Sequence, residues 1–165
     1  KGGVTTIEHG TLMSEETMDL MKQYGTYYVP TIIAGKEVVK MAQIKGFFPD
    51  IIVPKALEIG PKIQETFAKA YKRGVKIAFG TDAGVFDHGK NGEEFGYMVE
   101  AGMPAIEAIQ SATITNAKVL GLDDLGQIAS GFIADIVAVD EDPSKDISTM
   151  ANVSFVMKEG KIYKK

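Results

Sequence analysis

Short apolar runs and amphipathic stretches alternate along the first part of the chain. Runs rich in β-branched or aromatic residues at 4–8, 26–29 and 75–80 predict strands. The second run must stop before Pro30, because proline has no N–H to donate to a strand ladder. The third is apolar throughout, as in a parallel strand that is buried on both faces. Helical patterns separate these runs, so the chain is predicted to be an α/β protein with a parallel sheet.

The helices between the strands are predicted from periodicity and from end signals. The longest pattern covers 54–73, where apolar residues recur every three to four positions. Ser14 is the predicted N-cap of a helix that Gly25 ends. Further helices are predicted after Gly92, after Pro104 as the first helical residue, and up to Gly121. From these patterns we expect one core that contains Ile59, Ile63, Phe67, Val75, Ile77 and Phe79.

Two other segments do not follow this alternation of strands and helices. Residues 35–54 predict a short helical piece and then a loop with Phe47 and Phe48, which resembles a lid or insertion. From residue 126 onward strands follow one another without helices, including a run at 132–140 and a hairpin about Glu159 and Gly160. This tail is predicted to form a small sheet of its own, with Ile136, Val137, Val153, Phe155 and Ile162 in it and one edge unpaired.

The composition excludes several classes of function. The 165 residues are 45% hydrophobic and 24% charged, with a net charge of −4, which suits a folded core and gives no basic surface for nucleic acid. No strand is followed by a phosphate-binding glycine loop, so an open-sheet nucleotide binder is disfavoured. Neither a membrane span nor a signal peptide is present, so we expect a cytoplasmic protein without a membrane partner. Without cysteine, any metal must be held by nitrogen and oxygen.

Two residues with metal-ligand chemistry follow predicted strands. His9 follows the run at 4–8, and Asp82 follows the run at 75–80. In a barrel and in an open parallel sheet alike, functional residues gather at the C-terminal ends of the strands. A buried carboxylate there would need a partner or a metal. The residues alone leave alternatives open. Asp82 could cap the next helix or accept backbone N–H groups from the Gly84 turn, His9 could be a core histidine bonded to a carbonyl, and His88 a solvated loop residue.

Taken together, several motifs resemble the amidohydrolase superfamily, and most closely its prolidase-like and imidazolonepropionase-like metal hydrolases. The motifs are GVTTIEHGT at 3–11, YYVPT at 27–31, FGTDAG at 79–84 with HG at 88–89, and the long segments 98–122 and 126–143. The resemblance covers nearly the whole chain and implies a (β/α)8 TIM barrel with one or two divalent metals, zinc first among them. It implies strands six to eight with their helices in residues 1–122, and the C-terminal part of a small β-sandwich in 123–165.

The resemblance also implies roles for individual residues. His9 matches the strand-six histidine that ligates the second metal. Asp82 matches the strand-eight aspartate, which ligates the first metal and takes the proton of the attacking water. His88 and Tyr28 are expected to contact the substrate, and the loop with Phe47 to line the pocket. The implied reaction is hydrolysis of an amide or related C–N bond in a small substrate such as a dipeptide or a cyclic amide.

Other family ligands have no counterpart in the chain. The paired histidines of strand one, the lysine of strand four and the histidine of strand five are absent, and His9 and His88 are the chain's 2 histidines. A complete barrel takes about 250 residues. We therefore expect a C-terminal fragment, inactive alone, whose partners are the missing N-terminal half of the barrel and a small-molecule substrate. Open strand edges predict a homo-oligomer. The competing hypothesis is a non-catalytic chain that only folds or associates.

Overall fold

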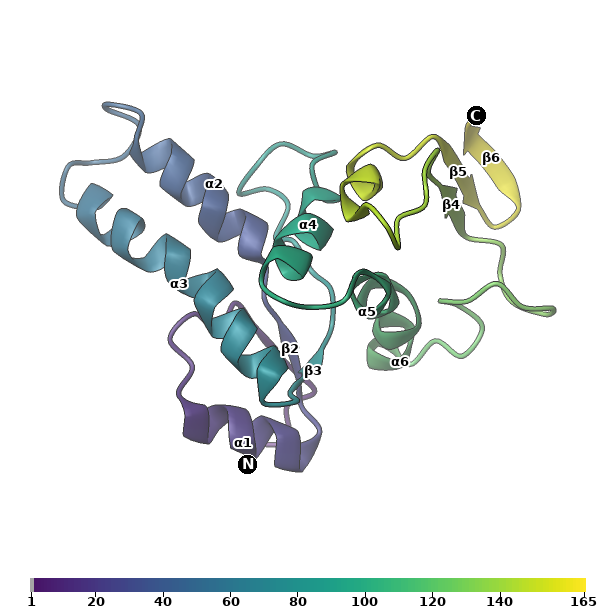
Figure 1. Ribbon diagram of the computed structural model, residues 1–165, viewed down its shortest axis with the longest axis horizontal. Coiled ribbons are helices and arrows are strands. Elements are labelled where there is room, and N and C mark those ends of the chain that lie inside the picture. Colours follow the sequence, from purple (N-terminus) through teal and green to yellow (C-terminus); the bar gives the residue numbers. More distant parts are fainter. Residues whose placement is uncertain (1) are drawn as a thin grey trace.

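The computed structural model describes residues 2–165 and contains a parallel sheet, a set of helices and a separate antiparallel sheet (Figure 1). The strands are β1 (Thr6–Glu8), β2 (Tyr27–Val29), β3 (Lys76–Ile77), β4 (Ile136–Ala138), β5 (Phe155–Lys158) and β6 (Lys161–Lys164). The α-helices are α1 (Glu15–Tyr24), α2 (Ile32–Ala42), α3 (Val53–Lys72), α4 (Glu93–Glu100), α5 (Ala105–Gln110) and α6 (Asn116–Leu120). The π-helical turn η1 (Ser111–Thr115) joins α5 to α6, and the 3-10 turn η2 (Ile147–Ala151) precedes β5.

The first three strands form a parallel sheet in the order β1-β2-β3, as the sequence predicted. It is part of a sheet and not a complete barrel, so the assignment to strands six to eight stays a prediction. β3 is shorter than the predicted run at 75–80 and consists of Lys76 and Ile77, which pair with Tyr27 and Tyr28 of β2. Past that point, the side-chain amide of Asn116 takes the place of a neighbouring strand. The N–H of Phe79 donates to Asn116 Oδ1 at 3.1 Å, and Phe79 O accepts from Asn116 Nδ2 at 2.9 Å.

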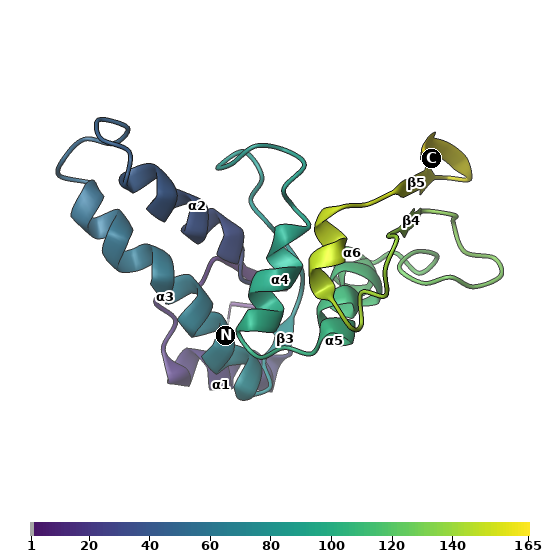
Figure 2. The ribbon, with the colours of Figure 1, turned by 45° about the horizontal axis from the view of Figure 1, so that its top comes forward.

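The helix ends follow the predicted signals in most places. The Ser14 hydroxyl accepts the Thr17 N–H and begins α1, while Gly25 ends it in the left-handed region at φ 70°. Pro104 is the N-cap of α5 and not its first residue. The short helical piece expected after residue 35 is a longer helix, α2, which begins at Ile32. Figures 1 and 2 show that α2 and α3 form a helical hairpin at the opposite end of the molecule from β4–β6.

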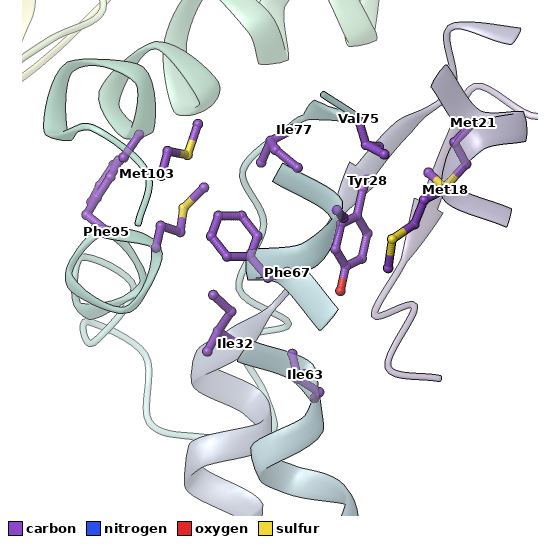
Figure 3. Close-up of a cluster of buried hydrophobic side chains, with 13 residues drawn as sticks. Met18, Met21, Tyr28, Ile32, Ile63, Phe67, Val75, Ile77, Phe95 and Met103 are labelled. Carbon is purple, nitrogen blue, oxygen red and sulfur yellow. The ribbon is translucent and has the colours of Figure 1, made fainter. Parts of the chain in front are cut away.

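Phe67 lies at the centre of the main core, where side chains from the sheet and from α1, α3 and α4 meet (Figure 3). Of the predicted core residues, four are buried in this cluster: Ile63, Phe67, Val75 and Ile77. Phe79 is half-buried and packs against the cluster. Ile59 is half-buried as well, but it faces a pocket beside Asp82 and lies outside the cluster. The core prediction is therefore confirmed for all but Ile59.

The C-terminal strands form the separate antiparallel sheet β4-β5-β6 that the sequence predicted. Glu159 and Gly160, with φ of 50° and 78°, make the turn between β5 and β6, as a two-residue hairpin requires. β4 and β6 are edge strands, and Val153 precedes β5 and does not lie within it. The turn η2 joins this part to the rest, because Ile147 and Met150 pack against the main core. Within residues 2–165, no helix has the length and apolar character that a membrane crossing requires.

Candidate active site

The loops after the three parallel strands share an unusual backbone conformation. His9 follows β1, Thr31 follows β2 and Asp82 follows β3, and their φ angles are 64°, 52° and 57°. The left-handed region costs a non-glycine residue about 1–2 kcal/mol, and such strain clusters at functional sites. Because the strands are parallel, all three residues lie at the same edge of the sheet. His9 and Asp82 follow next-neighbouring strands, with β2 between them.

His9 is held at its ring and at its main chain. Its Nδ1 lies 2.8 Å from the hydroxyl Oγ1 of Thr31, and its carbonyl accepts a 2.8 Å hydrogen bond from the hydroxyl of Tyr28. The side chain is exposed, so the alternative of a core histidine bonded to a carbonyl is wrong. If Nδ1 carries the proton and donates it to Thr31, the lone pair of Nε2 is free, as in a histidine that binds a metal.

Asp82 differs from its prediction in one respect. Its side chain is exposed in residues 2–165, whereas the prediction from the sequence assumed a buried strand-end carboxylate. The helix-cap alternative is also wrong, because α4 begins after Gly92 without a side-chain cap. In its loop, the Asp82 main-chain carbonyl accepts the N–H of Val85 at 3.2 Å. What singles out Asp82 is therefore its strained backbone at a strand end. In the described part of the chain, no cluster of three or more His, Cys, Asp or Glu is placed to hold a metal.

An apolar pocket of about 320 Å³ lies next to Asp82, between the two helices of the hairpin. Its walls come from α2 and α3, and Asp82 and Val85 close one side. Its lining includes the apolar residues Ala34, Val38, Ile59 and Ile63 and the basic residue Lys55. The position beside a strand-end carboxylate makes this cavity a candidate site for an apolar part of a substrate.

The other predicted substrate contacts lie elsewhere. Tyr28 is completely buried, with its hydroxyl on the His9 carbonyl, and His88 is exposed in the loop between Asp82 and α4. Phe47 is exposed at the turn between α2 and α3, packed edge-on against Phe48 at 5.0 Å, and is not among the residues that line the pocket. The substrate contacts predicted for Tyr28 and His88 stay predictions.

Sequence reasoning missed Thr31 and a buried acid, Glu94. Both carboxylate oxygens of Glu94 accept backbone N–H groups at the start of α2, from Ile32 at 2.9 Å and Ile33 at 2.7 Å. Burial raises the pKa of Glu94 to about 7, against the lowering effect of those two hydrogen bonds. In the sequence, Glu94 looks like an ordinary acid in the first turn of an exposed helix. Nothing local to it indicates a partner in another helix.

Comparison with known proteins decides the family. The sequence profile of the amidohydrolase family matches residues 1–163. The chain belongs to the amidohydrolase family. Among curated amidohydrolase relatives, the ochratoxinase of Aspergillus niger is 31% identical over 170 residues, which cover 99% of this chain and 35% of that enzyme. An uncharacterised protein of Mycobacterium bovis is 28% identical, and the match covers 98% of this chain and 43% of that protein.

Solved amidohydrolase structures share the fold. A Xaa-Pro dipeptidase with methionine bound in its active site is 57% identical with a TM-score of 0.95, covering 99% of this chain and 40% of that one. A prolidase in complex with N-methylphosphonate-L-proline is 33% identical with a TM-score of 0.86, covering 99% of this chain and 41% of that one. The chain thus spans less than half the length of these relatives. Family membership, which the motifs predicted, is confirmed.

Proposed function

We propose that the chain is part of a hydrolase that cleaves an amide bond in a small substrate, with His9 and Asp82 in its catalytic centre. The observation that carries the proposal is that His9 and Asp82, both with strained backbones, follow strands of one parallel sheet at the same end, with an apolar pocket beside Asp82. Membership of the amidohydrolase family and likeness to prolidase structures support amide hydrolysis as the reaction.

The two residues fit a divalent metal by their chemistry. The Nε2 atom of His9 is the free ring nitrogen when Nδ1 is bonded to Thr31. The Asp82 carboxylate is exposed and forms no ion pair within residues 2–165. A bound metal, zinc first among the candidates, would polarise the amide carbonyl and make water a nucleophile at neutral pH. Asp82 then accepts the proton of the attacking water and donates it to the leaving nitrogen as the C–N bond breaks.

The remaining parts of the centre belong to the rest of the barrel. A hydrolytic zinc site uses about three protein ligands. We therefore assign residues 1–122 to a partial barrel that supplies one ligand to each of two metals, Asp82 to the first and His9 to the second, and residues 123–165 to part of a small β domain. In a protein of the relatives' length, the other strands of the barrel supply the further ligands.

The pocket indicates the class of substrate. The pocket is lined by the hydrocarbon side chains of Ala34, Val38, Ile59 and Ile63. Burial of an apolar substrate group there is favourable by about 25 cal/mol per Å² of apolar surface removed from water. Lys55 stands at the same pocket and is suited to a substrate carboxylate. A dipeptide with an apolar residue combines both features. The dipeptidase and prolidase structures, with methionine and a proline phosphonate bound, support this choice.

The test is a substrate screen on a full-length protein that contains this chain. The protein is loaded with zinc, and hydrolysis of Met-Pro, Asp-Pro and a cyclic amide is monitored by measuring the free amino acid released. Bound metal is measured by elemental analysis. We expect turnover of Met-Pro, weaker turnover of Asp-Pro, and metal in stoichiometric amount. A folded, metal-loaded protein that hydrolyses none of the three would overturn the proposal and favour the non-catalytic alternative.

A further inference from the structure

Helix α2 begins next to the candidate active site, and its N-terminus is capped by a residue from another helix. Thr31 stands at the N-cap position of α2, but its side chain makes no capping hydrogen bond, because the hydroxyl is bonded to His9. Glu94 of α4 fills the gap with its two hydrogen bonds to Ile32 and Ile33. The first N–H groups of a helix need such acceptors, and the helix dipole favours a negative charge there.

Burying a glutamate at this position costs free energy of folding, so packing alone does not explain why it is there. The Glu94 side chain is fully buried, and no Lys, Arg or His forms an ion pair with it within residues 2–165. Burying a charge without a counter-ion is unfavourable, and the raised pKa of Glu94 reflects this. A carboxylate nevertheless does what a glutamine cannot, because it offers two acceptor oxygens to two adjacent N–H groups.

The capped segment is also the segment that holds His9. Thr31 directly precedes Ile32 and keeps its left-handed backbone at φ 52°, with Oγ1 at 2.8 Å from His9 Nδ1. The Tyr28 hydroxyl donates a hydrogen bond to the His9 carbonyl. Burial, and to a smaller degree the negative charge of Glu94, raises the pKa of the Tyr28 phenol. The residue that fixes the His9 ring, Thr31, therefore directly precedes the two residues whose N–H groups Glu94 binds.

We propose that Glu94 is a positioning residue for His9. By binding the first two N–H groups of α2, Glu94 fixes the backbone of Thr31, so that the Thr31 hydroxyl remains on Nδ1 and Nε2 stays free at the sheet edge. The importance of this device for catalysis rests on the proposed function, but the device itself is a property of the folded chain. It can be tested without metal, substrate or activity.

The test compares the two imidazole rings of the 165-residue chain by NMR. Long-range ¹H–¹⁵N correlations report which ring nitrogen carries the proton, and the chain contains only 2 histidines, so His88 is an internal reference. The spectra are recorded above pH 7, where the Glu94 carboxyl is ionised, and we expect one tautomer for His9 in the wild-type chain. In Glu94→Gln we expect shifted His9 ring signals with the loss of the single-tautomer pattern and unchanged His88 signals. Glu93→Gln is the matched control, since the neighbouring Glu93 carboxylate accepts from Tyr97 and not from α2.

A second variant keeps the inference testable if Glu94→Gln does not fold. Thr31→Val removes only the hydroxyl that links α2 to His9 and keeps a branched side chain of the same size. It is expected to change the His9 ring signals as Glu94→Gln does. The proposal is overturned if Thr31→Val, or a folded Glu94→Gln with cooperative thermal unfolding, leaves the His9 signals as they are in Glu93→Gln.

Discussion

Helices α2 and α3, which form the pocket beside Asp82, touch at two glycines, and this contact gives a sharp stability prediction. A Cβ atom added to Gly60 would lie 2.3 Å from Val39 Cγ2 and 2.9 Å from the carbonyl oxygen of Gly35. A side chain can rotate away, but a backbone carbonyl can move only with its helix. We therefore expect Gly60→Ala to push α2 and α3 apart.

The size of the effect follows from two opposing terms. Alanine favours a helix over glycine by about 1 kcal/mol. Overpacking a close contact costs about 1–3 kcal/mol, and a contact with backbone belongs near the upper end. The net expectation for Gly60→Ala is a loss of about 1–2 kcal/mol in the free energy of unfolding. Gly96, inside α4, is the matched control, since a Cβ there meets nothing within 4 Å. Gly96→Ala is expected to gain about 0.5–1 kcal/mol.

The assay is urea unfolding of both variants and the wild type, followed by far-ultraviolet circular dichroism. Both substitutions replace glycine by alanine inside a helix, so helix propensity alone predicts the same sign for both. Gly60 also precedes Pro61, and a Cβ before proline is disfavoured in a helix, which adds to the loss expected for Gly60→Ala. The structure predicts opposite signs. Equal or greater stability of Gly60→Ala relative to the wild type, at an unchanged m-value, would refute the close packing of α2 on α3.

Two further predictions concern charge and association. The folded-state pKa of Glu94, about 7, is above the ordinary 4.5, so Glu94 favours folding most below pH 4.5, and this contribution is lost as the pH rises to 7. Unfolding curves should show the wild type losing about 2–3 kcal/mol relative to Glu94→Gln over this range; parallel pH profiles of the two proteins would contradict the buried carboxylate. The isolated 165-residue chain is expected to self-associate through the open edge of β1, because unpaired strand edges invite pairing. Light scattering that gives a monodisperse monomer would argue against this.

Most of the structural features that the sequence could predict depend on interactions between residues close together in the chain. Ser14, Gly25 and the Glu159-Gly160 turn act on residues close to them, so their roles follow from chain position alone. The positions of His9 and Asp82 at strand ends follow from the alternation of strands and helices. Glu94 and Asn116 were missed because each bonds a backbone far away, 61 residues for Glu94 to Ile33 and 37 for Asn116 to Phe79.

The central claim is that Asp82 moves the proton in amide hydrolysis, and one comparison tests it most directly. The rate of Met-Pro hydrolysis is measured for a full-length, metal-loaded protein that carries Asp82→Asn, beside the same protein with Asp87→Asn. Asp87 is an exposed acid of the same loop, paired with Lys90 at 3.6 Å, and controls for the loss of one negative charge. We predict that kcat falls by about 10²-fold to 10⁴-fold in Asp82→Asn, the usual worth of a positioned acid-base group, and little in Asp87→Asn. Equal rates in the two variants would contradict the account.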